Sequence, residues 1–311
     1  MLDVRRLRLL RDLARLGTIA AVAQAHTYTP SAVSQQLATL EREAGVSLLE
    51  RTGRRVTLTP AGAVLVQHAE TVLAALEAAT AAVAATDGAL CGPLRIGAFP
   101  TAVRTLLPAA LVALGREHPG LDLMVTELDP IAVPDALRDR RLDIGLMHDY
   151  DVVPEQVDPA LDGVPLLAET VFLAVPAADG AVAWADGAGS ARDASWIVGS
   201  PGTLCHAVAL QVCRAAGFTP RIRHHADDFA TVLALVGAGQ GVALVPQLAV
   251  VDRPAAVGLV ELETRRRTRI AYRRGAAADP VIAASVSAIR AATDRYLRSP
   301  ADRPAIRCGT G

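Results

Sequence analysis

Residues 17–62 read GTIAAVAQAHTYTPSAVSQQLATLEREAGVSLLERTGRRVTLTPAG and contain the signals for two short helices joined by a tight turn. Thr18 and Thr29 are each placed to cap the start of a helix, and Pro30 suits the first helical position. The small residues that follow Thr18 allow a second helix to cross the first closely. This spacing predicts a helix-turn-helix with its turn at His26-Thr27-Tyr28.

The second predicted helix has two different faces. Its apolar face consists of Ala32, Val33, Leu37 and Leu40. The opposite face carries short polar side chains that can reach phosphates and base edges in a DNA major groove, where glutamine can pair with adenine through two hydrogen bonds. The predicted DNA-binding residues at this helix and its start are Thr29, Pro30, Ser31, Ser34 and Gln35.

A basic hairpin follows the second helix. Gly45 is placed to end that helix, and the segment 56–59 predicts a short strand. Arg51, Arg54 and Arg55 lie at the predicted hairpin, from which their side chains would reach DNA phosphates. The two helices and the hairpin together predict a winged helix-turn-helix, which is a DNA-binding fold.

At these residues the chain resembles the LysR-type transcriptional regulators. The shared features are the small residues of the first helix, a Ser-x-x-Ser pattern in the second, the Leu40-Glu41 pair, the arginine-rich wing and the closing Leu58-Thr59-Pro60-Ala61-Gly62. The resemblance extends over almost the whole chain. It implies an N-terminal winged helix-turn-helix, a long linker helix and a two-lobed α/β effector domain similar to periplasmic binding proteins. Four positions depart from the family pattern: Ile19, His26, Pro30 and Leu49.

Charge is distributed unevenly along the 311 residues. The whole chain has a net charge of −1, yet residues 1–65 hold nine arginines against five acidic residues, so this segment is +4 and the remainder −5. A basic segment favours contact with the DNA backbone. The hydrophobic share of 51% allows substantial cores. Because no apolar run is long enough for a membrane helix and no leader pattern begins the chain, we expect a cytoplasmic protein.

A long helix is predicted from residue 63 to about residue 85, where no proline or glycine interrupts the chain. Its apolar residues recur at intervals of four and three, which is typical of helices that pack on a partner helix. These residues are Leu65, Ala69, Val72, Leu76, Ala79 and Val83. The stripe could pack on its own domain, but it favours a homodimer or homotetramer, because two-fold symmetric proteins match partly palindromic DNA.

From residue 94 onward, predicted strands alternate with helices. This order predicts parallel strands with right-handed crossovers, in two half-sheets joined by two connections. We therefore expect a winged helix-turn-helix at 1–62, a linker and dimerisation helix at 63–90 and an effector-binding domain at 91–311. Lobe I would comprise about 91–166 and 267–299, and lobe II about 167–266.

Ligands of open α/β sheets bind beyond the carboxyl ends of the strands, facing helix N-termini. The loops at those ends contain the candidate effector-binding residues Pro100, Thr101, Ala102, Glu127, Met147, His148, Ser200, Gly202, Thr203 and Asp227. Thr101 and Thr203 lie at two predicted helix starts, where hydroxyls and backbone amides could hold a carboxylate. An anionic small molecule is therefore favoured, although a threonine at a helix start can equally be a simple cap.

Other clusters of reactive residues have simpler explanations. The His224-His225 pair suggests a metal site, but an aspartate N-cap better explains the acidic residues that follow it. The glycines at 237–241 follow a predicted helix, which is the reverse of the order in a phosphate-binding loop. No nucleophile elbow or zinc-protease motif is present. We therefore expect no enzyme activity, no metal and no cofactor.

Four cysteines, Cys91, Cys205, Cys213 and Cys308, are too few and too scattered for a disulfide framework. Peroxide-sensing members of the LysR family carry two cysteines in a region similar to that of Cys205 and Cys213, so a thiol-based redox sensor is the alternative function. These two lie in one predicted helix with about 12 Å of rise between them, whereas a disulfide needs Cα atoms within roughly 7 Å. Cys205 is also one position out of register with the peroxide-sensor pattern. A regulator controlled by a small-molecule effector remains the main interpretation.

Overall fold

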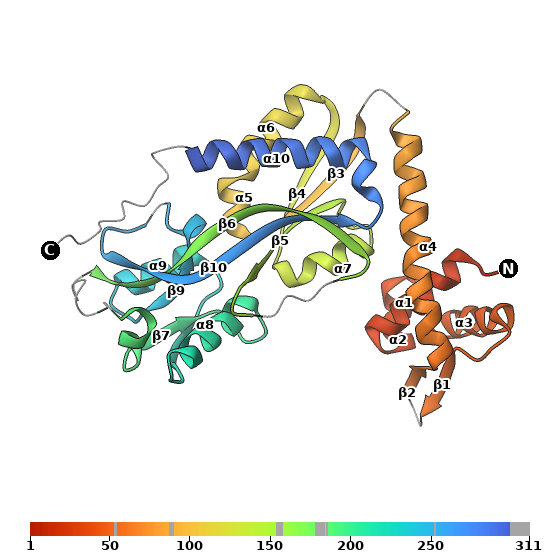
Figure 1. Ribbon diagram of the computed structural model, residues 1–311, viewed down its shortest axis with the longest axis horizontal. Coiled ribbons are helices and arrows are strands. Elements are labelled where there is room, and N and C mark those ends of the chain that lie inside the picture. Colours follow the sequence, from red (N-terminus) through yellow and green to blue (C-terminus); the bar gives the residue numbers. More distant parts are fainter. Residues whose placement is uncertain are drawn as a thin grey trace. The chain divides into compact units, whose positions relative to one another are not determined.

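The computed structural model describes residues 1–52, 55–86, 90–153, 158–177, 184, 186–251 and 253–298. The chain divides into two compact units, which are described separately (Figure 1). The first unit contains Met1–Gly88, Pro159–Asp162 and Arg273–Pro280. The second contains Ala89–Asp158, Gly163–Tyr272 and Val281–Gly311, and is called the α/β domain below.

The first unit is mainly helical. Its elements are α1 (Val4–Leu16), α2 (Ile19–Ala25), α3 (Pro30–Ala44), the hairpin β1 (Leu49–Thr52) and β2 (Arg55–Leu58), and the long helix α4 (Pro60–Ala84). The capping signals in the sequence are all used. Thr18 accepts a hydrogen bond from the first turn of α2, Thr29 does the same for α3, and Gly45 ends α3 with a φ of 71°.

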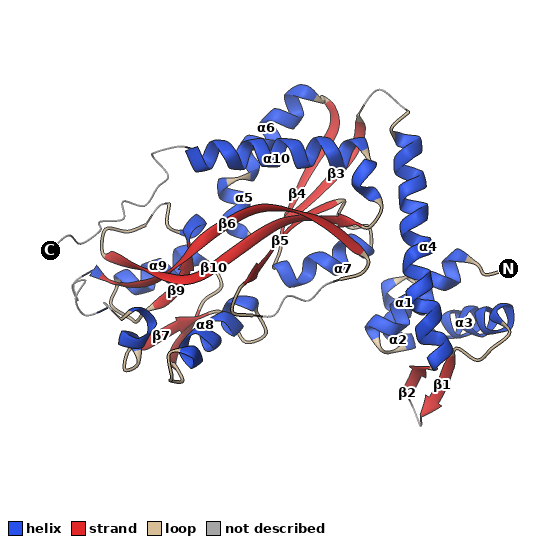
Figure 2. Ribbon diagram, viewed as in Figure 1, coloured by secondary structure: helices blue, strands red, loops and turns tan. Residues whose placement is uncertain are grey.

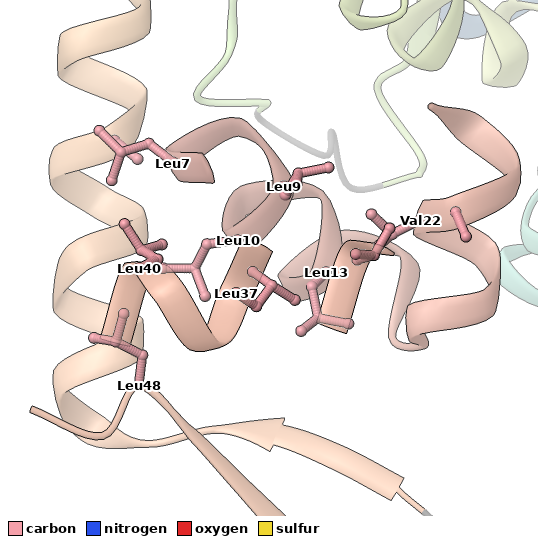
Figure 3. Close-up of a cluster of buried hydrophobic side chains, with 11 residues drawn as sticks. Leu7, Leu9, Leu10, Leu13, Val22, Leu37, Leu40 and Leu48 are labelled. Atoms are coloured by element: carbon pink, nitrogen blue, oxygen red, sulfur yellow. The ribbon is translucent and has the colours of Figure 1, made fainter. Parts of the chain in front are cut away.

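These helices close around one hydrophobic core (Figure 3). α1, which lies before the helix-turn-helix motif, contributes Leu7, Leu9, Leu10 and Leu13 to it. α2 and α3 contribute Val22, Ala23, Val33, Leu37 and Leu40. Because burial of each large apolar side chain stabilises a fold by about 1.5–3 kcal/mol, the four leucines of α1 make it an important support for α2 and α3.

α4 begins directly after the hairpin. Thr59 caps it by accepting a hydrogen bond from the N–H of Gly62 at 3.0 Å. Gly62 lies so close to the Leu48 carbonyl that a β-carbon at this position would overlap with it, which explains the closing glycine of the motif. Farther along, Glu77 of α4 accepts a hydrogen bond from Arg273 at 2.7 Å, and η6 (Ala276–Ala278) packs on the same helix.

A six-stranded mixed sheet forms the centre of the α/β domain, with strand order β4-β3-β5-β10-β6-β9 (Figure 2). Its strands are β3 (Cys91–Ala98), β4 (Gly120–Glu127), β5 (Ile144–Tyr150), β6 (Leu161–Pro176), β9 (Ala243–Pro246) and β10 (Val257–Arg273). β3 runs parallel to β4 and β5, whereas β10 is antiparallel to β5, and β6 is antiparallel to β9. A separate parallel pair consists of β7 (Ser195–Val198) and β8 (Arg221–His225).

The sheet differs from the two half-sheets expected from the sequence. β6 and β10 are 16 and 17 residues long and lie side by side, so one continuous sheet extends through both predicted lobes. The reason is visible in the burial of β6, which alternates along its first half and is continuous along its second half. Two burial patterns in one strand resemble two separate elements when only the sequence is available.

The helices of the α/β domain follow the strand ends. They are α5 (Pro100–Thr105), α6 (Leu107–Glu117), α7 (Val133–Arg138), α8 (Leu204–Ala215), α9 (Phe229–Gly237) and α10 (Pro280–Arg298), with short turns η1 (Pro130–Ala132), η4 (Gly187–Ala191) and η5 (Gln247–Ala249). α5 starts directly after β3, and α9 starts shortly after β8. Among the described residues, none of the helices combines the length and apolar character needed to cross a membrane.

Candidate functional site

A hydrogen bond to α1 holds the turn between α2 and α3. Nε2 of His26 lies 2.6 Å from Oδ2 of Asp12, and Arg11 lies 2.8 Å from the other oxygen of this buried carboxylate. Thr27 adopts a φ of 56°, the left-handed conformation for which glycine is often used at this turn. The contact with Asp12 explains why position 26 carries a polar side chain.

The polar face of α3 points away from the core. Thr29, Pro30, Ser31 and Gln35 are exposed, and Ser34 is half-buried. The Ser34 hydroxyl donates to the Pro30 carbonyl at 2.9 Å, and the Thr29 and Ser31 hydroxyls lie 3.2 Å apart. These hydroxyls therefore have local partners in the free protein but keep lone pairs that can accept hydrogen bonds.

β1 and β2 form the expected antiparallel hairpin. Arg51 belongs to β1 and Arg55 to β2, whereas Arg54 lies outside the described residues. Oε1 of Glu41 anchors the hairpin, because it accepts hydrogen bonds from two backbone N–H groups at the start of the hairpin, at 2.9 and 3.1 Å. The acidic residue of the Leu-Glu pair thus ties the hairpin to α3.

The predicted dimerisation stripe is divided between two environments. Ala69 is buried in the core of the first unit, and Leu65 packs against that core, so packing within the chain accounts for these two positions without a partner copy. The first turns of α4 are needed to complete the helix-turn-helix core. The remaining members are exposed and are called the α4 stripe below: Val72, Leu76, Ala79 and Val83.

A cavity of about 190 Å³ lies in the α/β domain near the carboxyl ends of β3, β4 and β5. α5 and β5 supply residues from the predicted lobe I, and the starts of α8 and α9 supply residues from the predicted lobe II. The lining residues are Phe99, Pro100, Thr101, Glu127, Leu128, Asp129, Pro130, His148, Leu204, Cys205, Asp227, Phe229 and Arg266. A cavity of about 150 Å³ can hold benzene, so this one has room for a small organic molecule.

Arg266 brings a buried ion pair to this cavity. Its Nη2 lies 3.0 Å from Oε2 of Glu169 and 3.2 Å from the Thr101 hydroxyl, and its guanidinium lies 4.8 Å from the centre of the Phe99 ring. The other Glu169 oxygen accepts a hydrogen bond from the N–H of Leu248 at 3.0 Å. Burial alone lowers the pKa of Arg266, but the Glu169 charge raises it, and the net result is a pKa above its ordinary value. Arg266 is therefore positively charged.

His148 is the second buried polar residue of the cavity. Its ring meets the Phe99 ring edge-on, with 4.6 Å between centroids. Within the described part of the chain, neither ring nitrogen of His148 has a hydrogen-bond partner, nor has Nε of Arg266. Burial, and to a lesser extent the Arg266 charge, lowers the pKa of His148 well below 6.5. The neutral ring offers one donor and one acceptor to a ligand.

This lowered pKa predicts a pH-dependent stability. Below about pH 6.5 the unfolded chain protonates His148 while the folded α/β domain does not, so the free energy of unfolding should fall as the pH decreases, by up to about 1.4 kcal/mol per pH unit. Urea unfolding between pH 7 and pH 5 measures this slope. His148→Gln should reduce it, whereas the control His68→Gln, at an exposed position of α4, should not. An unchanged slope in His148→Gln would contradict the assignment.

Five of the ten candidate effector-binding residues line the cavity: Pro100, Thr101, Glu127, His148 and Asp227. The structure does not place the other five in its wall. Ala102 is fully buried, and Met147 lies on the opposite face of β5 from His148, because successive residues of a strand alternate. Ser200, Gly202 and Thr203 belong to the loop before α8.

The side chains of that loop bind other parts of the protein. The N–H and hydroxyl of Ser200 donate to the two oxygens of Asp227, at 2.7 and 2.6 Å. The Thr203 hydroxyl donates to the Ser200 carbonyl at 2.8 Å and accepts from the N–H of His206 at 3.3 Å. Capping therefore accounts for Thr203 without a ligand.

The cavity is also lined by residues that were not predicted from the sequence, chiefly Arg266 and Cys205. Cys205 lies in the first turn of α8, and Cys213 is fully buried farther along the same helix. Burial raises the pKa of both thiols, that of Cys213 to about 12. Cys91 is exposed, and Cys308 lies outside the described residues.

The histidine-rich segment before α9 has a structural explanation. Asp228 caps α9 by accepting a hydrogen bond from the N–H of Thr231 at 2.9 Å, as expected for an aspartate at this position. His206 and His225 both bind the Gly199 carbonyl, at 3.0 and 3.1 Å. In the described residues, no cluster of three or more histidine, cysteine or acidic side chains could hold a metal ion.

The first unit is a winged helix-turn-helix, and the α/β domain contains a cavity of ligand size. This combination is typical of transcriptional regulators that carry a DNA-binding domain and an effector-binding domain in one chain. Comparison with protein families agrees with this class. Residues 4–63 match the bacterial regulatory helix-turn-helix proteins of the lysR family, and residues 87–294 match the LysR substrate binding domain. The chain belongs to the LysR family of transcriptional regulators.

Its relatives include regulators of the peroxide response. The chain is 33% identical over 252 residues to a probable hydrogen peroxide-inducible genes activator of Mycobacterium avium, with 78% of each chain covered. It is 31% identical over 305 residues to the DNA-binding transcriptional dual regulator OxyR of Escherichia coli (strain K12), covering 93% and 97%. The solved structure of a full-length OxyR mutant from Pseudomonas aeruginosa has the same fold, with a TM-score of 0.58 at 24% identity, covering 95% of that chain and 93% of this one.

Proposed function

We propose that this LysR-type regulator acts as a homodimer in the cytoplasm, reads a partly palindromic DNA site through α3 and the wing, and changes its DNA binding when a small molecule occupies the cavity. The exposed polar face of α3 carries this proposal, because its side chains have no role in the core. The net charge of +4 in residues 1–65 supports contact with phosphates. The Escherichia coli relative is itself named a DNA-binding regulator.

The roles of the DNA-binding residues follow from their positions. Gln35, with support from Ser34, would read base edges, and Arg51, Arg54 and Arg55 would contact phosphates. Thr29, Pro30 and Ser31 lie at the start of α3, where backbone N–H groups suit a phosphate. The α4 stripe would join two copies and so set the separation of the two recognition helices.

Control by the cavity requires two states of the protein that differ in ligand affinity. Residues of both predicted lobes line the cavity, so a ligand can change how the lobes pack on each other. Among the residues that the structure describes, the ring nitrogens of His148 have no partner, so they provide hydrogen-bonding groups that a ligand would satisfy. We therefore assign the effector to this cavity and assign no enzyme reaction to it.

A binding selection from random DNA duplexes with the full-length protein tests the DNA-reading function. We expect enrichment of a sequence with two related half-sites, separated by about one helical turn or a multiple of it. A protein without the reading function would enrich no sequence, and that result would contradict the proposal.

Thiol redox sensing with Cys205 and Cys213 is a second candidate, favoured by the relatives named as hydrogen peroxide-inducible activators. The geometry of α8 opposes it, since eight residues of helix separate the two Cα atoms by about 12 Å, beyond the roughly 7 Å limit for a disulfide. The raised pKa values of both thiols also keep the reactive thiolate scarce at neutral pH.

We accordingly expect that peroxide treatment forms no disulfide between Cys205 and Cys213. Peptide mass mapping under non-reducing conditions measures this directly, with Cys213→Ser as the reference in which the disulfide cannot form. Detection of the linked peptide in the wild-type protein, together with a change in DNA affinity that Cys213→Ser lacks, would establish the redox function instead.

A further inference from the structure

Carboxylates are concentrated around the cavity of the α/β domain. Glu127 ends β4, Asp129 precedes η1 and Asp227 lies before α9, and all three are exposed side chains that line the cavity. An adjoining hollow shares Glu127 and Asp227 with the cavity and adds Asp228 and Arg104. Acidic side chains therefore outnumber basic ones in the two hollows together.

The cationic group inside the cavity is already neutralised. Arg266 is paired with Glu169 at 3.0 Å, and both side chains are only 1% exposed. An anion in the cavity would meet the surrounding carboxylates, and the charge of Arg266, the basic residue of the cavity lining, is already balanced by Glu169. The partial positive charge at the helix N-termini does not make the cavity favourable for an anion. α5 has only six residues, and the Thr203 hydroxyl is used to cap α8.

The residues inside the cavity can bind a molecule that carries a polar group on an apolar framework. His148 is only 9% exposed, lines the cavity and has no partner at either ring nitrogen among the described residues. One of these nitrogens can accept a hydrogen bond from a ligand N–H group. Leu128, Leu204 and Phe229 provide apolar contacts around it.

We infer that the effector is a small organic cation, with an apolar body somewhat larger than benzene and a protonated amine that lies among Glu127, Asp129 and Asp227. This inference rests on the proposed effector function of the cavity and specifies the chemical class of its ligand. It differs from the anionic effector expected from the sequence, an expectation that depended on helix starts alone. Attraction by several carboxylates in a partly enclosed site provides the selectivity for a cation.

Matched probes test the inference with the full-length protein. Calorimetry would compare the binding of benzylamine, benzyl alcohol and benzoate, and that of the corresponding cyclohexyl compounds. Within each series the ring is the same and the charge of the substituent differs. We expect the amine to bind about tenfold more tightly than the alcohol of the same body, and the carboxylate to bind more weakly than the alcohol. Raising the salt concentration should weaken the binding of the amines alone.

Two variants test where in the cavity the amine binds. Glu127→Gln should lower the affinity for the amine about three- to fivefold and leave that for the alcohol unchanged. Asp122→Asn is the matched control, because it removes an exposed carboxylate from the same strand at a position that does not line the cavity, and it should change neither affinity.

Three results would overturn the inference: tighter binding of the carboxylates than of the amines, no binding of either amine, or an unchanged amine affinity in Glu127→Gln. The proposed function fails separately, through the DNA selection, which contains no ligand. If the carboxylate probes bind and Thr101→Val weakens their binding, the cavity remains the effector site and only the cationic class of effector is rejected.

Discussion

Replacement of Arg266 by methionine should destabilise the α/β domain by about 3–5 kcal/mol, because it leaves the Glu169 carboxylate buried without its counter-ion. The loss should appear as a lower midpoint in urea unfolding. The double variant Arg266→Met with Glu169→Gln should recover most of it, since glutamine keeps an oxygen that can accept from the Leu248 N–H without a buried charge.

The neighbouring residue provides a matched control. Arg265 pairs with Glu261 at 3.1 Å, but these side chains are 39% and 44% exposed. Arg265→Met should therefore cost no more than about 1 kcal/mol. Equal destabilisation by Arg265→Met and Arg266→Met would contradict the view that the buried pair supports the cavity.

The double substitution Val72→Glu and Leu76→Glu should convert the protein to monomers with little affinity for its DNA site. The two side chains are 39% and 44% exposed in the single chain, and in a dimer joined by the α4 stripe four glutamates would lie close together in a buried seam. Analytical ultracentrifugation measures the change of mass, and fluorescence anisotropy measures DNA binding.

Gln67→Glu with Thr71→Glu is the control for charge. Both positions are exposed on α4 and lie about a third to two fifths of a turn around the helix from the stripe, so this pair should leave the dimer intact. A dimer that persists in the Val72 and Leu76 variant would remove the α4 stripe from the interface.

The reading domain could be predicted closely from sequence because its signals are local. Thr18, Thr29 and Gly45 act within one helical turn of their own positions, and each has the predicted role. The packing of Leu65 and Ala69 on the core of the first unit could not be predicted in this way. A heptad repeat shows that a helix face is apolar, but only the packing on α1, distant in sequence, decides whether that face is already covered.

The cavity was predicted only in part, for a related reason. Strand ends indicated Thr101, Glu127 and His148, because the rule for ligands at carboxyl ends depends on chain order. Arg266 lies within a strand, in a run of three arginines that suggests solvent exposure. The informative signal was its alternation with Thr264 and Thr268, which are also buried, but this signal is weak without knowledge that β10 crosses the centre of the sheet.

DNA reading by α3 is tested most directly by the affinity of Gln35→Ala for the DNA site recovered by selection, measured by fluorescence anisotropy beside Gln36→Ala. Gln36 is the adjacent residue of α3, but its side chain accepts a hydrogen bond from Arg6 of α1 at 2.8 Å. We expect that Gln35→Ala loses about 1–3 kcal/mol of binding free energy at this site and little on unrelated DNA, whereas Gln36→Ala keeps the sequence preference. Unchanged affinity and unchanged preference in Gln35→Ala would contradict the assignment of α3 as the helix that reads DNA.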